Sequence, residues 1–312
     1  MIKSIKQEIK KVIVGQDNLL DSMLIALLSQ GHILLEGVPG VAKTTAVNSL
    51  AQTLGLKFKR VQFTPDLLPS DITGNEILDL KNNEFTIKHG PIFTNLLLAD
   101  EINRAGAKVQ SALLEAMAEK QVTIGEDSFK LPSVFMVLAT SNPIDQDGTY
   151  ELPEASLDRF MLKIKVHYNS FEEEFEIAKR ATNIGFETIK QILNLEELEN
   201  LRKKCKEVFL DDEISKYILK IVFATREPKN YGLEEFADYI SYGVSPRATI
   251  DLHNASKARA FLNNKDYVTP YDVIEVVHQV LGHRMILNYK ADSKGITTKD
   301  IINKIIEVTK AP

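Results

Sequence analysis

The sequence predicts an α/β protein in which a parallel sheet covered by helices is followed by a helical domain. Over the first half of the chain, short runs typical of strands alternate with helical patterns. This alternation requires crossover connections, which produce a parallel sheet with helices on both faces. Beyond about residue 168 the strand patterns nearly vanish and helical patterns follow one another.

The predicted sheet comes from buried apolar runs, from one alternating segment and from a further candidate near the middle of the chain. The buried runs have the length of strands and end at Gly, at acidic residues or at Thr, and the alternating segment is KFKRVQF. In chain order these segments are 32–37, 57–63, 95–101, 133–140 and 159–166. Two further stretches, 76–90 and 120–132, each have a turn between alternating halves, and we interpret both as hairpins inserted beside the sheet.

The helical patterns divide the chain into two predicted domains. In the first half they cover most of residues 1–30, with a break at Val14-Gly15-Gln16, and then 44–54 and 107–120. In the second half they lie near 170–182, 196–208, 211–226, 246–263 and 270–281. We therefore predict an α/β core at residues 1–168 and a helical domain at residues 169–312.

The composition excludes several classes of protein. Apolar residues make up 44% of the chain, enough to build cores, so a disordered chain is excluded. The net charge of -5 argues against a dedicated nucleic-acid binder, which needs a basic stripe. Cys205 is the only cysteine, so an internal disulfide is impossible, and no run is long enough to span a membrane. We expect a soluble cytoplasmic protein.

A candidate phosphate-binding loop follows the first predicted strand. GVPGVAKT, residues 37–44, fits the pattern GxxxxGK[ST] except that Ala42 takes the place of the second glycine. In such a loop, backbone N–H groups and the helix dipole hold phosphates, a lysine reaches the β and γ phosphates, and a hydroxyl holds Mg²⁺. Lys43 and Thr44 would have these roles. The alternative is an ordinary Gly-Pro turn.

Two acidic residues, Asp100 and Glu101, end the predicted strand at 95–101. Ligands of parallel α/β sheets bind at the carboxyl ends of the strands. Asp100 would hold Mg²⁺ through water there, and Glu101 would act as the base for an attacking water. The alternative, a solvated strand end, is weakened by the phosphate loop earlier in the chain.

Three further polar residues are candidates for phosphate chemistry, each with a simpler alternative. Asn142, after the next strand, could bind the γ-phosphate and the attacking water, or it could form a turn before proline. Arg159 could stabilise charge in phosphoryl transfer from a neighbouring subunit, or it could make a local ion pair. Arg247, in the first turn of a predicted helix, opposes the helix dipole and suits an anionic ligand, although it could be an ordinary surface residue.

The motifs together resemble those of the MoxR family of AAA+ ATPases. From Val12 to Arg247 they occur in the family's order and cover most of the chain: VIVGQ, HILLEGVPGVAKTT, QFTPDLLPSDITG, HGPIFTNLLLADEINRA, VQSALLEAMAEKQVTI, VLATSNP, GTYELPEASLDRFM and GVSPRA. Single motifs are common to many AAA+ proteins, but DEINRA followed by GTYELPEASLDRF is specific to this family. The resemblance implies a core with a five-stranded parallel sheet and an all-helical lid.

The resemblance also implies a role for each candidate residue. It gives Asp100 and Glu101 as Walker B, Asn142 as sensor 1, Arg159 as the arginine finger and Arg247 as sensor 2, acting in cis or in trans. Residues of the Walker A loop and its flanks would bind ATP: Gly37, Val38, Pro39, Gly40, Val41, Ala42, Lys43, Thr44 and Thr45. Val14, Gly15 and Gln16 lie where the family packs the adenine. Thr44 and Asp100 would hold Mg²⁺.

The function that the resemblance implies is Mg²⁺-dependent ATP hydrolysis coupled to remodelling or activation of other proteins. The family's ATPases form rings, usually hexamers, and often work with a partner that has a von Willebrand factor A domain. Three alternatives stay open: a DNA-acting AAA+ motor, a nucleotide-gated scaffold with slow turnover, and a metabolite kinase. The acidic charge argues against the first, and the presence of Glu101 argues against the other two.

Overall fold

We describe the fold from a computed structural model of the 312-residue chain. The structure describes residues 1–37, 41–80, 83–142 and 150–312. The contacts divide the chain into two compact units, each built from three stretches of sequence. The first unit comprises Met1–Met23, His32–Arg159 and Ile164–Asn200, and the second comprises Leu24–Gly31, Phe160–Lys163 and Leu201–Pro312.

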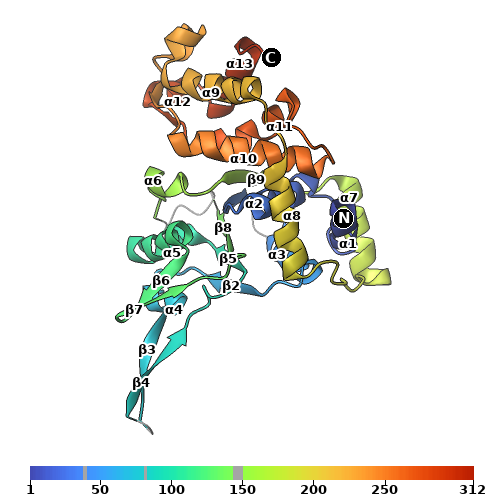
Figure 1. Ribbon diagram of the computed structural model, residues 1–312, viewed down its shortest axis with the longest axis vertical. Helices are drawn as coiled ribbons and strands as arrows, with labels where there is room; N and C mark the ends of the chain where they lie inside the picture. Colours follow the sequence, from blue (N-terminus) through green and yellow to red (C-terminus); the bar gives the residue numbers. More distant parts are fainter. Residues whose placement is uncertain (38–40, 81–82, 143–149) are drawn as a thin grey trace. The chain divides into compact units, whose positions relative to one another are not determined.

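The predicted five-stranded parallel sheet is present, and four of its strands lie wholly in the first unit, whereas β9 has residues in both units (Figure 1). Its strands, in the order β2-β5-β8-β1-β9, confirm the five segments that the sequence indicates. Parallel pairing joins β2 to β5, β5 to β8 and β8 to β1. The strands are β1 (Ile33–Gly37), β2 (Phe58–Gln62), β5 (Leu96–Asp100), β8 (Met136–Ser141) and β9 (Leu162–Val166).

Burial differs sharply between the middle and the edge of this sheet. In β5 and β8 every residue except the last is buried, which explains their unbroken apolar sequences. Strand β2 lies at the edge, where Phe58 and Val61 are half-buried and its other three residues are exposed. The polar side chains of β2 are therefore free to extend towards the carboxyl end of the sheet, where β5 ends in Asp100.

Helices and two hairpins complete the first unit. Helix α5 buries Val109, Leu113, Leu114 and Met117, the face that its sequence predicts. Both predicted hairpins are confirmed, as β3 (Gly74–Asp79) with β4 (Glu84–His89) and β6 (Gln121–Ile124) with β7 (Asp127–Lys130). The helices that lie wholly or partly in this unit are α1 (Ile2–Ile9), α2 (Asp17–Ser29), α3 (Lys43–Thr53), α4 (Pro69–Thr73), α5 (Ala107–Glu119), α6 (Glu154–Leu157), α7 (Phe171–Lys179) and α8 (Leu195–Glu207).

The second unit is helical, as predicted, with one addition. Strands β10 (Ile240–Tyr242) and β11 (Ile286–Leu287) form a short antiparallel pair that the sequence analysis missed. The Thr269–Asp272 capping box starts α11 and illustrates how the helices of this unit begin. The remaining helices are α9 (Asp212–Arg226), α10 (Pro246–Leu262), α11 (Pro270–Leu281), α12 (Tyr289–Ser293) and α13 (Thr298–Val308).

The compact units depart from the predicted division at residue 168 in two places. Helix α7 and the start of α8 stay with the first unit, and Arg180, just after α7, donates hydrogen bonds to the carbonyls of Lys10 and Lys11. Residues 24–31 belong to the second unit, where Arg202 donates to the carbonyl of Leu27. The functional division at 168 stays a prediction. In the part of the chain that the structure describes, no helix is long and apolar enough to cross a membrane.

Candidate functional site

The loop between β1 and α3 is conformationally constrained at both of its described ends. Gly37 ends β1, and a Cβ there would lie 2.5 Å from the carbonyl oxygen of Val166, so only glycine fits. Ala42, just before α3, has φ 54° and ψ 24°, a left-handed conformation that costs an L-residue about 1–2 kcal/mol. Alanine therefore supplies the turn for which the usual motif has glycine. Val38, Pro39 and Gly40 lie outside the described residues.

Lys43 is the first residue of α3, and its side chain reaches back to the end of β1. Its Nζ donates a hydrogen bond of 2.8 Å to the carbonyl oxygen of Gly37. Burial lowers the pKa of the Lys43 ammonium, and the carboxylates of Asp100 and Glu101 act in the opposite direction. A half-buried ammonium at a helix N-terminus, close to two carboxylates, is a suitable group for binding a phosphate.

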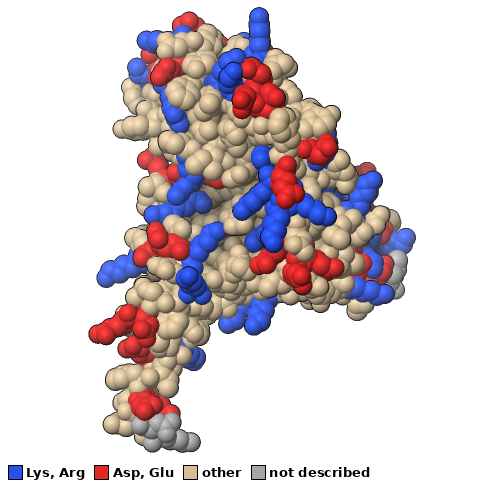
Figure 2. All heavy atoms as spheres, viewed as in Figure 1, with Lys and Arg blue, Asp and Glu red and all other residues tan. Residues whose placement is uncertain are grey.

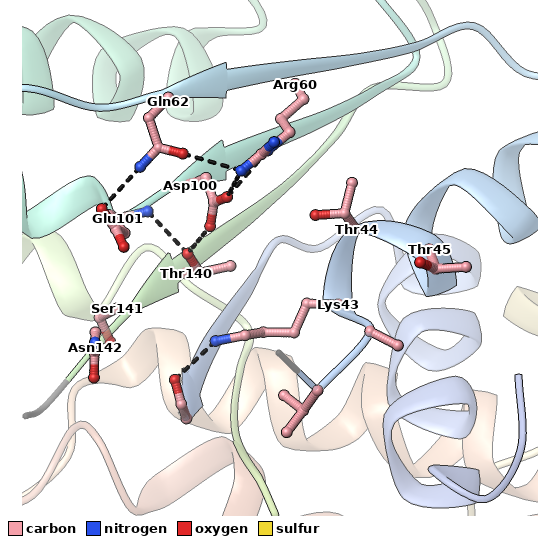
Figure 3. A pocket seen from close by; sticks show the side chains of 13 residues that line it. Lys43, Thr44, Thr45, Arg60, Gln62, Asp100, Glu101, Thr140, Ser141 and Asn142 are labelled. Carbon is pink, nitrogen blue, oxygen red and sulfur yellow. Dashed lines mark hydrogen bonds and ion pairs between the residues drawn. The ribbon is translucent and has the colours of Figure 1, made fainter. Parts of the chain in front are cut away.

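Asp100 ends β5, and both of its carboxylate oxygens accept hydrogen bonds. Thr140 Oγ1, on β8, donates to Oδ1 at 2.6 Å. The Arg60 guanidinium, on β2, donates to Oδ2 from Nε at 3.0 Å and from Nη2 at 2.5 Å (Figure 3). Side chains from both neighbouring strands thus fix the position of this carboxylate.

Glu101 follows directly and has a left-handed backbone conformation, with φ 57°. Its Oε2 accepts a hydrogen bond of 2.8 Å from Gln62 and forms an ion pair of 3.0 Å with Arg104. The Glu101 N–H donates to Thr140 Oγ1 at 2.8 Å. Thr140 therefore contacts both acids, and each acid also has side-chain partners of its own.

These groups line one cavity of about 370 Å³, large enough for a phosphate-bearing ligand. Figure 3 shows Lys43 and Thr44 on one side, Asp100 and Glu101 on the other, and Asn142 near the end of β8. The remaining lining residues are Gly37, Val41, Ala42, Thr45, Arg60, Gln62, Thr140 and Ser141. The cavity is thus built from the loop before α3 and the carboxyl ends of β1, β2, β5 and β8.

Comparison with known proteins places the chain in a family. The model of the ATPase family associated with various cellular activities (AAA) matches residues 32–162, and that of the AAA lid domain matches residues 235–305. The chain is 47% identical over 305 residues to Chaperone MoxR1 of Mycobacterium tuberculosis, an alignment covering 98% of this chain and 81% of that one. The chain belongs to the MoxR family of AAA+ ATPases.

Two other relatives agree with this assignment. The protein YeaC of Bacillus subtilis is 43% identical over 307 residues, which cover 98% of this chain and 93% of that one. A crystal structure of a presumed ATPase from Cytophaga hutchinsonii is 49% identical, with a TM-score of 0.95, over 100% of this chain and 94% of that chain. The AAA+ fold and the ATPase class predicted from sequence are therefore confirmed.

The predicted site residues divide into those that line the cavity and those that lie elsewhere. Described residues of the predicted Walker motifs and Asn142 line it together. Val14, Gly15 and Gln16 are not among its lining residues, and they form a turn that is tied to residues 167–169. Gln16 donates to the carbonyl of His167, and Asn169 donates to the carbonyl of Val14.

The two candidate arginines also lie outside the lining set. Arg159 follows α6 in the first unit, is half-buried, and its backbone N–H donates to the carbonyl of Ser156. Arg247 is exposed in the first turn of α10, in the second unit. Their roles as arginine finger and sensor 2 remain proposals for this MoxR protein.

Sequence reasoning missed Arg60, Gln62 and Thr140, although all three contact the acids. Arg60 and Gln62 are two residues apart on β2, so they share one face of the strand. The sequence did contain an indication of their role, because Arg60 and Gln62 both form hydrogen bonds and lie on one face of their strand. From a strand next to 95–101, such side chains could reach the acids at the end of that segment. Thr140 gave a weaker signal, as one hydroxyl at the end of an apolar run.

Proposed function

We propose that this MoxR protein hydrolyses ATP with Mg²⁺ and couples the hydrolysis to remodelling or activation of other proteins. The observation that carries the proposal is that Lys43 and Thr44 share a cavity with Asp100 and Glu101. A phosphate-binding cation, a hydroxyl and two carboxylates at the end of a parallel sheet are the groups that hydrolysis of a nucleoside triphosphate requires.

The donor set fits Mg²⁺. The Thr44 hydroxyl and the Asp100 carboxylate line the same cavity, and both are oxygen ligands of the kind that the ion prefers. When bound, Mg²⁺ would neutralise charge on the phosphates. The Thr140 hydroxyl would keep the Asp100 carboxylate oriented for this role, because it holds Oδ1 directly.

Each remaining residue of the site has a distinct task in the proposed reaction. Lys43 would bind the phosphates together with the N–H groups at the start of α3. Glu101 would accept the proton of the attacking water, with Gln62 and Arg104 holding its Oε2. Asn142 would orient that water through its side-chain amide. Arg159 would stabilise the developing charge at a neighbouring subunit's site.

Action on proteins is supported by the β3–β4 hairpin, which extends from the first unit (Figure 1). Phe85 is 71% exposed and Leu78, directly opposite on β3, is 41% exposed. Figure 2 shows this hairpin as mostly uncharged surface with acidic side chains near its outer part. An exposed apolar pair on a projecting hairpin is suited to contact with another polypeptide.

The hairpin is also connected to the second hairpin and so to the sheet. His89, at the end of β4, packs against Phe93 and Phe129 with ring centroids 4.2 Å and 5.0 Å away. The Glu76 carboxylate packs so closely on Gly125, in the β6–β7 turn, that a Cβ there would lie 2.0 Å from Glu76 Oε1. Nucleotide-dependent movement near the site would therefore be transmitted to both hairpins.

The wider assembly is proposed from family membership. Six subunits would form a ring in the cytoplasm, and a protein with a von Willebrand factor A domain would act with this ring. The similarity to a protein named as a chaperone supports action on protein clients.

The test of the proposed function separates binding from hydrolysis. Lys43→Ala should abolish ATP binding, because the phosphates lose their main cation. Glu101→Gln should retain binding and lose hydrolysis, since an amide cannot take the proton of the water. Titration with a fluorescent ATP analogue and a phosphate-release assay measure the two steps. Undiminished affinity in Lys43→Ala would rule out the phosphate-loop assignment, and turnover by Glu101→Gln would place the base elsewhere.

A further inference from the structure

Arg60 is the one charged side chain of β2 that lines the cavity among the described residues. It lies opposite Leu98 of β5, and Gln62 lies opposite Asp100. Since Arg60 and Gln62 share a face of the strand, the Arg60 guanidinium lies between the Gln62 amide and the Asp100 carboxylate, at the carboxyl end of β5 (Figure 3). The position of this guanidinium is therefore set by the register of the sheet.

The contacts of Arg60 occupy one oxygen of Asp100 completely. Nε and Nη2 both donate to Oδ2, at 3.0 Å and 2.5 Å, and each carboxylate oxygen has two lone pairs. The other oxygen, Oδ1, accepts from Thr140 at 2.6 Å and retains one lone pair. A metal ion, or a water bound to it, can use Oδ2 only when the guanidinium moves away.

We propose that Arg60 is a further residue of the ATPase site, where it competes with Mg²⁺ for Asp100 Oδ2 and provides positive charge for the phosphates when the metal is absent. This inference rests on the proposed Mg²⁺-dependent function. The Arg60 side chain is 50% exposed, whereas that of Asp100 is 17% exposed. The guanidinium can thus turn towards solvent or towards a phosphate, while Asp100 stays in place.

Gln62 connects Arg60 to Glu101, the proposed catalytic base, through hydrogen bonds. A guanidinium only donates hydrogen bonds and a carboxylate only accepts them, so an amide between the two must present its oxygen to Arg60 and its nitrogen to Glu101. The distances agree: Arg60 Nη2 to Gln62 Oε1 is 3.1 Å, and Gln62 Nε2 to Glu101 Oε2 is 2.8 Å. Displacement of Arg60 by the metal would remove one partner of the amide that holds Glu101.

The experiment compares the metal dependence of nucleotide binding in matched variants. The dissociation constant of a fluorescent ATP analogue is measured with excess Mg²⁺ and with EDTA, and the ratio of the two constants is the readout. Arg60→Gln should raise the EDTA-to-Mg²⁺ ratio about tenfold, since it removes a cation that repels Mg²⁺ and supports metal-free binding. Arg60→Lys, with a single point charge, should give an intermediate ratio.

Lys59→Gln is the control for loss of a positive charge. Lys59 is exposed and adjacent on β2, and its side chain leaves the opposite face of the strand. Its ratio should equal that of the unaltered protein. Thermal melting checks that each variant is folded, and the Arg60→Lys arm decides the question if Arg60→Gln does not fold.

The outcomes separate this inference from the proposed function. If the unaltered protein binds no nucleotide in either condition, the proposed function fails. If it binds nucleotide but the Arg60 variants have the ratio of Lys59→Gln, then Arg60 forms only a surface ion pair and the inference is overturned. A raised ratio in Arg60→Gln and an intermediate ratio in Arg60→Lys, with Lys59→Gln unchanged, support it.

Discussion

Thr140 Oγ1 donates a hydrogen bond of 2.6 Å to Asp100 Oδ1 and accepts one of 2.8 Å from the backbone N–H of Glu101. One hydroxyl on β8 thus orients the proposed metal ligand and the backbone that carries the proposed base. Thr140 is 2% exposed, so water does not readily replace it.

Replacement of Thr140 by valine should damage both stability and hydrolysis. Valine has nearly the same shape but lacks the hydroxyl, so a half-buried carboxylate oxygen and the Glu101 N–H lose their partner. The unfolding free energy should fall by about 1–3 kcal/mol. ATP hydrolysis should fall by about 10- to 100-fold, because both acids lose their orientation, while ATP binding changes much less. Thr140→Ser retains the hydroxyl and should behave like the unaltered protein; similar losses in both variants would refute this role.

The apolar face of the β3–β4 hairpin should be needed for client binding and not for hydrolysis. Leu78→Ser combined with Phe85→Ser removes the exposed apolar pair. In the Glu101→Gln background with ATP, proteins that co-purify should be lost, whereas the same pair of changes in the active protein should leave the ATPase rate unchanged. Ile77→Ser is a matched control, since Ile77 is also 41% exposed but on the other face of the hairpin. Equal loss of clients with Ile77→Ser would show that the hairpin has only a structural role.

Arg159 should act on the ATP of a neighbouring subunit. Arg159→Ala and Glu101→Gln should each be inactive alone. In rings formed from an equal mixture of the two variants, about a quarter of the subunit junctions pair an intact Glu101 with an intact Arg159. ATPase activity should therefore return. The measurement is the ATPase rate across mixing ratios, with subunit exchange verified by labelled subunits. No recovery in verified mixed rings would contradict action in trans.

His32 should make the fold less stable in mild acid. Its Nδ1 accepts from the N–H of Val137 at 3.0 Å, and its Nε2 then donates to the carbonyl of Met117 at 3.3 Å. Burial lowers the pKa of His32 from 6.5 to about 4. The unfolded chain therefore binds the proton more tightly, and stability present above about pH 6.5 is lost as the pH falls towards 4.

Between about pH 7 and about pH 5, this histidine should reduce the unfolding free energy by about 2 kcal/mol. Urea unfolding at both values tests this against His32→Asn, which should show a correspondingly smaller change with pH. The change with pH is the readout, because the replacement itself destabilises the protein at both values. The pKa of His283 is also lowered by burial, to about 3, and it contributes equally to both proteins. The same pH dependence in both would disprove the role of His32.

The sequence was sufficient for features that depend on local pattern. Apolar runs predicted the strands, and the order of Lys43, Thr44, Asp100 and Glu101 predicted which side chains meet at the carboxyl end of the sheet. It was insufficient for Arg60 and Gln62, because an alternating polar strand is equally typical of a solvated edge. The pairing of β2 beside β5 gives these residues their role, and pairing is a property of the fold.

Other features could not be predicted from local sequence patterns, each for a different physical reason. Strands β10 and β11 are too short to show a period. The left-handed conformation of Ala42 is imposed by the loop against the residue's own preference. Residues 24–31 belong to the second compact unit through contacts such as that of Leu27 with Arg202, which is far away in the sequence.

The β3–β4 hairpin is inserted in the chain between β2, which carries Arg60 and Gln62, and β5, which ends at Asp100. Residues 63–73 join Gln62 of β2 to the start of β3, and residues 90–95 join β4 to β5, which ends at Asp100. Tension applied by a client at the hairpin would thus be carried along the backbone into both strands at once.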